Sequence, residues 1–124
     1  MHDEAIVDWC VERGVPCVPG ALTPTEVLAA WHAGASAVKL FPASIVGPGY
    51  ISQLRGPFPH IPLLPTGGIS ADDAAAWIAA GAIGVGLGGW LIGDGEPTGI
   101  EARARAVRAA VDQVASTVTT RSTS

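Results

Sequence analysis

The sequence contains few charged residues and no cluster of positive charge. Charged residues make up 15% of the 124 positions, whereas hydrophobic residues make up 48%. Disordered proteins combine low hydrophobicity with high net charge, so this composition excludes that class. The net charge is −4 and there is no basic run. The sequence therefore lacks the electrostatic pattern of proteins that bind nucleic acids or anionic membranes, and we expect neither partner.

Cysteine and histidine are also scarce. The two cysteines, Cys10 and Cys17, are too few for a disulfide framework, and the three histidines have no spacing typical of metal ligands. We therefore expect no metal site and no cofactor. The first four residues show neither a basic segment nor an apolar segment of a signal peptide, so a cytoplasmic location is expected.

One uncharged run, residues 74–93, is long enough to cross a membrane as a helix. Six of its 20 residues are glycine. In a helix each glycine costs about 1 kcal/mol relative to alanine, so a membrane-spanning helix is disfavoured. We interpret this run as two soluble elements that meet at a turn.

Helix and strand patterns alternate along the chain. Strong helix starts are expected at Thr23, which has Glu26 three residues later, and at Ser70. The four tryptophans fall largely on apolar helical positions and are expected in the core. The expected strands are residues 15–19, 37–41, 61–65 and 82–87, and the expected helices are residues 3–13, 23–33, 50–54, 70–80 and 98–118. Such alternation through short turns indicates βαβ units and a parallel sheet.

The spacing of the expected strands indicates half of a barrel. The strands begin near residues 15, 36, 61 and 82, and each interval corresponds to one β/α unit. A closed (β/α)8 TIM barrel needs eight strands and at least ~200 residues. We therefore predict an α/β fold in which residues 1–118 form a partial barrel of about four β/α units with parallel strands. A polar tail is expected at residues 119–124.

Lys39, the only lysine in the chain, lies in the middle of an apolar strand. The period-two alternation of strands places Val38 and Leu40 on one face, and Lys39 with Phe41 on the other. In a barrel Lys39 would point inward, where desolvation favours the neutral amine that attacks a ketone to form a Schiff base. The alternative is a lysine on an edge strand, with a packed stem and an ammonium group in water.

Two glycine pairs follow consecutive expected strands. Gly67 and Gly68 come after Thr66, and Gly88 and Gly89 follow the next strand. Such turns let backbone N–H groups approach a phosphate, but they are equally compatible with tight strand-to-helix turns. The glycines also fit a G-x-G-x-x-G pattern. No helix is expected directly after that pattern and no acidic strand end follows, so a nicotinamide site is disfavoured.

Four motifs occur in order: PGALTPTE at 19–26, VKLFPA at 38–43, GPFP at 56–59 and PTGG at 65–68. Together they resemble the 2-keto-3-deoxy-6-phosphogluconate / 4-hydroxy-2-oxoglutarate aldolase family. The resemblance covers nearly the whole chain except the tail. It implies the C-terminal half of a (β/α)8 barrel and a lyase that cleaves a phosphorylated keto acid to pyruvate and glyceraldehyde 3-phosphate. It also implies a homo-oligomer, often a trimer.

The resemblance further implies residue roles. Lys39 corresponds to the Schiff-base lysine and Phe41 to an aromatic residue beside the pyruvyl group. The remaining matches form the phosphate site, with Thr66, Gly67 and Gly68 on one side and Gly88 and Gly89 on the other. Many relatives carry a serine before the tryptophan, where this chain has Gly89 before Trp90.

The chain lacks the part that corresponds to the first four strands of the family. The glutamate that acts as general base and the arginine that holds the pyruvate carboxylate belong to that part. Two hypotheses follow. The chain represents the C-terminal half of an aldolase, with activity impaired by the missing base. Alternatively, it is a non-catalytic half-barrel that associates through its open sheet edges or complements a missing N-terminal half.

Overall fold

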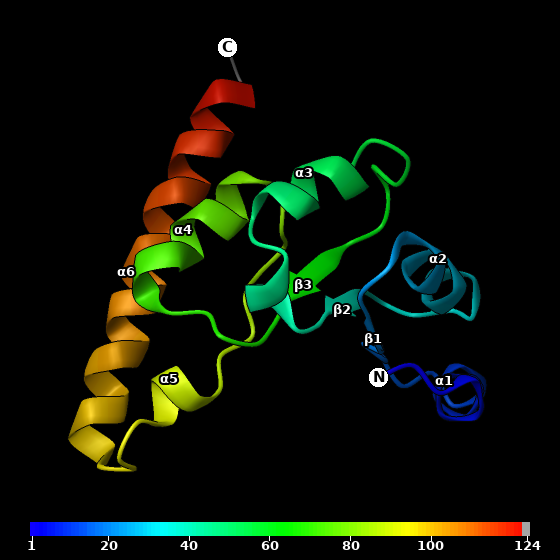
Figure 1. Ribbon diagram of the computed structural model, residues 1–124, viewed down its shortest axis with the longest axis horizontal. Helices are drawn as coiled ribbons and strands as arrows, with labels where there is room; N and C mark the ends of the chain where they lie inside the picture. The colour runs from blue at the N-terminus through cyan, green and yellow to red at the C-terminus, as the bar shows by residue number, and fades with distance from the viewer. Residues whose placement is uncertain (123–124) are drawn as a thin grey trace.

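Three short parallel strands form the centre of the structure, a computed structural model that describes residues 1–122 and the side chains of residues 1–117 (Figure 1). The strands are β1 (Gly20–Ala21), β2 (Val38–Leu40) and β3 (Leu63–Pro65), in the order β1-β2-β3. In the register of the sheet, Lys39 lies opposite Gly20 on one side and Leu64 on the other. The predicted α/β fold with parallel strands is confirmed.

Helices connect the strands. The remaining elements are α1 (Glu4–Glu12), α2 (Pro24–His32), the 3-10 turn η1 (Ala43–Ile45), α3 (Gly49–Leu54), α4 (Ala71–Ala79), α5 (Gly89–Ile92) and α6 (Pro97–Ser122). At the start of α2, Thr23 and Glu26 form the predicted capping box, with the Thr23 amide donating to Glu26 Oε1 at 3.0 Å. At the start of α4, the Ser70 amide donates to Asp73 Oδ1 at 2.7 Å.

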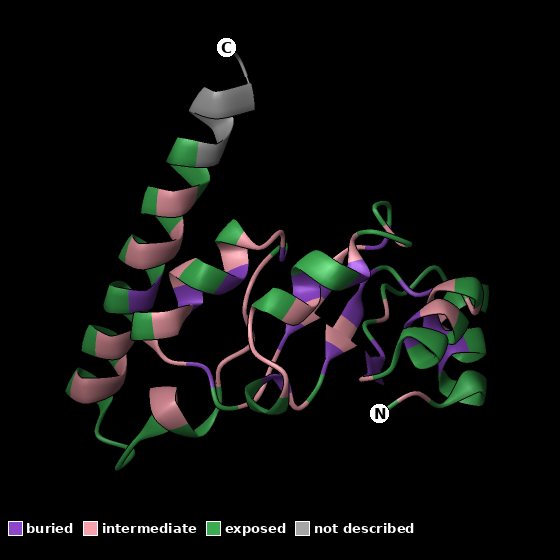
Figure 2. Ribbon diagram, turned by 45° about the horizontal axis from the view of Figure 1, so that its top comes forward, coloured by how far each residue is buried: buried purple, intermediate pink, exposed green. Residues whose placement is uncertain are grey.

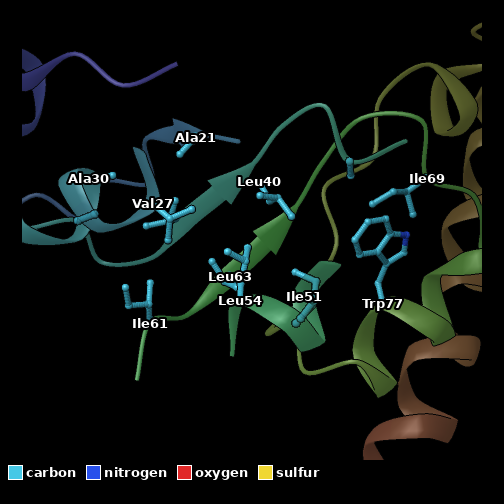
Figure 3. Close-up of a cluster of buried hydrophobic side chains, with 14 of the residues drawn as sticks. Ala21, Val27, Ala30, Leu40, Ile51, Leu54, Ile61, Leu63, Ile69 and Trp77 are labelled. Carbon is cyan, nitrogen blue, oxygen red and sulfur yellow. The ribbon is translucent and has the colours of Figure 1, made fainter. Parts of the chain in front are cut away.

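The core lies between one face of the sheet and helices α2, α3 and α4 (Figure 3). Val38, Leu40 and Leu63 point into it and are fully buried. The helices contribute further fully buried side chains, among them Val27, Ile51 and Trp77. Burial of these apolar surfaces, at about 25 cal/mol per Å², is the main force that holds the helices on this face.

The opposite face of the sheet remains partly open. Lys39 and Leu64 alternate with the buried residues of β2 and β3 and are only half-buried (Figure 2). Phe41, two residues beyond Lys39, is 44% exposed. The sheet therefore has one face covered by helices and one face that carries Lys39 toward solvent.

The strand expected at residues 15–19 is not formed. The chain enters the sheet only at Gly20, while Val15 and Val18 are 44% and 41% exposed. Pro16 and Pro19 have no N–H group to donate to a neighbouring strand, which limits pairing in this segment. At the outer edge of β1 the Gly20 amide instead donates to the Met1 carbonyl at 3.0 Å.

The strand expected at residues 82–87 is reduced to a single parallel bridge between Thr66 and Gly86. Two backbone hydrogen bonds still align it with β3, from Ile83 N to the Leu63 carbonyl and from Gly86 N to the Pro65 carbonyl. The segment is therefore a fourth sheet element in position, although it does not have regular strand geometry.

The C-terminal helix differs from expectation at both ends. It begins at Pro97 rather than at a Thr98 cap, and it continues to Ser122 instead of ending near residue 118. The predicted polar tail is therefore helical through residue 122, and residues 123–124 lie outside the described part. Helix α6 packs mainly against α4. No helix among residues 1–122 is both long enough and apolar enough to span a membrane.

The expectation that all four tryptophans lie in the core is wrong for Trp9. Trp77 is 1% exposed, but Trp9 on α1 is 53% exposed and Ile6 on the same helix is 59% exposed. Arg13 lies over the Trp9 ring, with its guanidinium carbon 4.3 Å from the ring centre. The outer side of α1 is therefore an uncovered apolar surface in the described structure.

Candidate active site

Lys39 and Phe41 lie side by side on the open face of the sheet. The Lys39 Nζ atom is 4.9 Å from the centre of the Phe41 ring, within the range of a cation–π contact. The strand fixes this arrangement, because residues two apart in a strand point to the same face. The sequence-based placement of both side chains on one face is therefore correct.

The glycine turn that follows β3 lies beside Phe41. Gly67 and Gly68 have φ values of +102° and +72°, which side chains rarely adopt. A Cβ atom built on Gly67 would lie 3.1 Å from Cε2 of Phe41. The Phe41 ring thus lies close to both the Lys39 ammonium group and the glycine turn, so three of the predicted site residues are brought together.

A residue that the sequence analysis missed flanks the same turn. Ser44, in η1, lies so close to Gly68 that an added Cβ would be 3.0 Å from its Oγ atom. Two backbone hydrogen bonds hold η1 there, from Ala43 N to the Thr66 carbonyl and from Ser44 N to the Gly67 carbonyl. No local sequence pattern distinguishes this serine, because its position depends on pairing across the sheet.

The second glycine turn follows the 82–87 segment. The Thr66 side chain lies directly against Gly86, leaving no room for a Cβ there. By contrast, ideal Cβ atoms on Gly88 and Gly89 would meet no atom within 4 Å. Packing therefore requires glycine at position 86 but not at 88 and 89, which keep an open approach to their backbone.

A hollow of about 420 Å³ lies along the β1 edge, beside Phe41. Its lining residues include His2, Ala21, Leu22 and Glu26. The Glu26 carboxylate is held by the Thr23 hydroxyl and amide, and these hydrogen bonds lower the pKa of the carboxyl from its ordinary 4.5. Glu26 is therefore a helix-capping residue, as the sequence predicts.

Metal ligands are not assembled in the described residues. No group of three or more His, Cys, Asp or Glu side chains is placed to hold an ion within that part of the chain. The site offers one amine, one aromatic ring, the hydroxyl groups of Ser44 and Thr66, and the backbone of two glycine turns.

Parallel strands with helices on one face and a lysine on the other define a segment of a (β/α)8 barrel. The family model described as "KDPG and KHG aldolase" matches residues 2–102. The chain belongs to the KDPG and KHG aldolase family, whose members are lyases.

Curated relatives and solved structures agree with this assignment. The chain is 39% identical over 114 residues to a "Probable 2-dehydro-3-deoxy-6-phosphogalactonate aldolase" of Rhizobium meliloti, covering 90% of this chain and 54% of the relative. It is also 39% identical over 97 residues to the 2-dehydro-3-deoxy-6-phosphogalactonate aldolase of Escherichia coli K12, covering 77% of this chain and 47% of the relative. A structure described as "Native KDPGal structure" superposes with a TM-score of 0.87 and 32% identity, covering 93% of this chain and 57% of the other.

The chain spans about half the length of the curated relatives it matches. The match to part of an aldolase barrel confirms the prediction of a partial (β/α)8 fold and the predicted family.

Proposed function

We propose that this chain carries the Schiff-base half of an aldolase for a phosphorylated 2-keto-3-deoxy sugar acid. The products would be pyruvate and glyceraldehyde 3-phosphate. The observation that carries the proposal is the contact of Lys39 with Phe41, which in turn lies against Gly67. The names of the two relatives at 39% identity favour the six-carbon phosphogalactonate isomer as substrate.

In this mechanism the neutral Lys39 Nζ attacks the C2 carbonyl, and the resulting carbinolamine loses water to form an iminium ion. The iminium draws the electron pair of the C3–C4 bond as that bond breaks. The C4 hydroxyl loses its proton and becomes the aldehyde of glyceraldehyde 3-phosphate. The enamine left on Lys39 takes up a proton at C3, and water then releases pyruvate and the free amine.

Phosphate binding would come from the glycine turns. Thr66, Gly67 and Gly68 supply one side of the proposed site, and Gly88 and Gly89 supply the other. Two glycines at positive φ present backbone N–H groups without side chains in the way. The open space around Gly88 and Gly89 is consistent with the approach of a ligand to their backbone.

Proton transfer is the step for which the described residues offer no positioned group. The family resemblance assigns the general base to the first four strands of the barrel, and Glu26 Oε1 accepts the capping hydrogen bonds of α2. Loss of a general base typically slows a reaction by about 10²–10⁴-fold. We therefore expect Schiff-base formation to survive better than complete turnover.

Trapping of the Schiff base with borohydride in the presence of pyruvate tests this proposal. Lys39 is the only lysine, so one adduct on the peptide that contains residue 39 identifies the site without ambiguity. Lys39→Arg keeps the positive charge but removes the nucleophile, and it also measures any reaction at the N-terminal amine. An adduct in the wild type that is absent from Lys39→Arg supports the proposal. A folded wild-type chain that forms no adduct overturns it.

A second candidate function rests on the open borders of the sheet. Ile83, beside β3, is 61% exposed, and Trp9 and Ile6 are exposed on α1 at the other end of the sheet. Unpaired strand edges favour pairing with another chain. We infer that the chain also serves as one half of a barrel that a second polypeptide or a second copy completes. Sedimentation at micromolar concentration tests this role, and a stable monomer would contradict self-association.

A further inference from the structure

Arg103 on α6 holds the end of the short helix α5. Its Nε atom donates to the Leu91 carbonyl at 2.8 Å, and its Nη2 atom donates to the Ile92 carbonyl at 3.1 Å. These are the last two residues of α5, whose carbonyl groups accept no hydrogen bond within the helix, although the Ile92 carbonyl also accepts one from the Gly95 amide at 2.9 Å. A planar guanidinium reaches two carbonyl groups at once, which the single ammonium group of lysine does less well.

Two glycines make room for this guanidinium. A Cβ atom on Gly93 would lie 2.6 Å from Nη2 of Arg103, and one on Gly99 would lie 3.1 Å from Nη1. Gly93 also has a φ of +55°. The Arg103 side chain therefore occupies a space that any residue other than glycine at these two positions would reduce.

The contact at the end of α5 is connected to the glycine turn at its start. The amides of Leu91 and Ile92 donate to the Gly88 carbonyl at 2.9 and 3.1 Å, and the amide of Gly93 donates to the Gly89 carbonyl at 2.9 Å. A helix of four residues is not stable in isolation, because nucleation is costly and few hydrogen bonds compensate for it. The conformation of Gly88 and Gly89 therefore depends on the external contacts that fix α5.

Arg103 differs from Arg105 and Arg108, which lie on the same helix. Arg105 and Arg108 form exposed ion pairs with Glu101 and Asp112, one turn away on α6. No such ion pair joins Arg103 to a carboxylate in the described residues, and its Nε hydrogen bond is partly buried. Its hydrogen bonds go to backbone carbonyls of α5, so its role is to hold that segment.

We propose that Arg103 is a positioning residue that fixes α5 and thereby holds the Gly88–Gly89 turn in the conformation that receives the substrate phosphate. This inference rests on the proposed function, because it needs that turn to bind phosphate. Arg103 lies far from Gly88 along the chain, so a local sequence motif does not connect the two residues.

The test measures binding of glycerol 3-phosphate to the full chain by NMR, using the amide signals of Gly88 and Gly89. Arg103→Met should weaken binding about fivefold to tenfold, the effect of about one hydrogen bond. Arg103→Lys should fall between Arg103→Met and the wild type. Arg105→Met is the matched control, because Arg105 lies on the same helix in an exposed ion pair, and it should bind as the wild type does.

Two further measurements separate positioning from a general loss of structure. Pyruvate trapping at Lys39 should be unchanged in Arg103→Met, because Lys39 does not depend on α5. Added guanidinium at millimolar concentration should restore phosphate binding to Arg103→Ala by occupying the vacated space. A variant that loses trapping and binding together would show a structural role only and would overturn the inference.

The failures of the two proposals are distinguishable. If Arg103→Met binds glycerol 3-phosphate as tightly as the wild type, Arg103 has no positioning role, and the proposed function stands. If the wild type traps pyruvate but shifts neither glycine signal, the phosphate role of the turn is wrong and the Arg103 inference falls with it. If the folded wild type traps no pyruvate, the aldolase proposal itself fails.

Discussion

The Phe41 ring lies close to both Lys39 and Gly67. Its centre lies 4.9 Å from the Lys39 Nζ atom, and its Cε2 atom lies 3.1 Å from the position of a Cβ on Gly67. One aromatic side chain therefore limits the motion of the amine and also fills the space beside the glycine turn. This double contact makes Phe41 the most informative position for testing the geometry of the site.

Replacing Phe41 with leucine should slow pyruvate trapping at Lys39 by about twofold to fivefold. Ordering a lysine side chain involves up to ~1.5–2 kcal/mol of rotamer entropy, and a change in part of it, about 0.5–1 kcal/mol, corresponds to this range. The physical reason is that a Lys39 side chain without the ring samples more orientations. Ile45→Ala is a suitable control, because Ile45 is 69% exposed and lies in the adjacent 3-10 turn. Equal trapping rates for Phe41→Leu and the wild type would show that the ring does not orient the amine.

Substitution of two glycines near the second turn should lower stability at one position and leave it nearly unchanged at the other. Gly86→Ala places a methyl group against the Thr66 side chain and should lower the free energy of unfolding by about 1–3 kcal/mol. Gly89→Ala places it in open space and should change stability by less than ~0.5 kcal/mol. Urea unfolding of the two variants measures the difference. Similar losses in both would mean that Thr66 does not pack tightly on Gly86.

The features that the sequence predicts correctly depend on neighbours within a few residues. The capping box of Thr23 and Glu26 involves positions three apart, and the shared face of Lys39 and Phe41 involves positions two apart. Periodicity and cap preferences describe such relationships directly. The parallel arrangement of the strands also follows from local patterns. Parallel strands need a crossover connection, and a helix between two strands supplies it.

The features that the sequence missed depend on contacts between distant segments. The run at 82–87 has the composition of a strand but pairs through only one bridge, since regular geometry also depends on a neighbour at its other edge. The Arg103 side chain bonds to Ile92 and Leu91, which are 11 and 12 positions away along the chain. Ser44 lies against Gly68, which follows the neighbouring strand. No period or cap signal contains such information, which is why both residues were absent from the predicted site.

The capping box at the start of α2 should make stability depend on acid pH. Hydrogen bonds from the Thr23 side chain and amide lower the pKa of Glu26 below its ordinary 4.5. Because the folded pKa is lower than the unfolded one, the stabilisation is present above about pH 4.5 and is lost as the pH falls through the folded pKa. Glu26→Gln should therefore be less stable than the wild type near pH 7, and the difference should shrink as the pH falls below about 4.5 and through the folded pKa.

Thermal unfolding of Glu26→Gln and wild type across this range checks the dependence. Glu96→Gln serves as the control, because the Glu96 side chain forms no hydrogen bond or ion pair with another described residue. A constant difference between wild type and Glu26→Gln at all pH values would rule out the carboxylate as the origin of the stabilisation.

Tyr50 provides a test at the alkaline end of the pH range. Its hydroxyl donates to the Leu22 carbonyl at 2.7 Å and links α3 to the loop after β1. Burial, together with the negative charge of Glu26, raises the pKa of Tyr50 above its ordinary 10.0. Since the folded pKa exceeds the unfolded one, stability is retained below about pH 10 and declines as the pH rises through the folded pKa.

Tyr50 is the only tyrosine, so an ultraviolet titration of the folded chain reports this group alone, and we expect a midpoint above 10.0. Tyr50→Phe should lose about 1 kcal/mol of stability near neutral pH, because the Leu22 carbonyl is left without its donor. A titration midpoint at or below 10.0 would show that the hydroxyl is free in water and that α3 is not tied to the β1 loop through this bond.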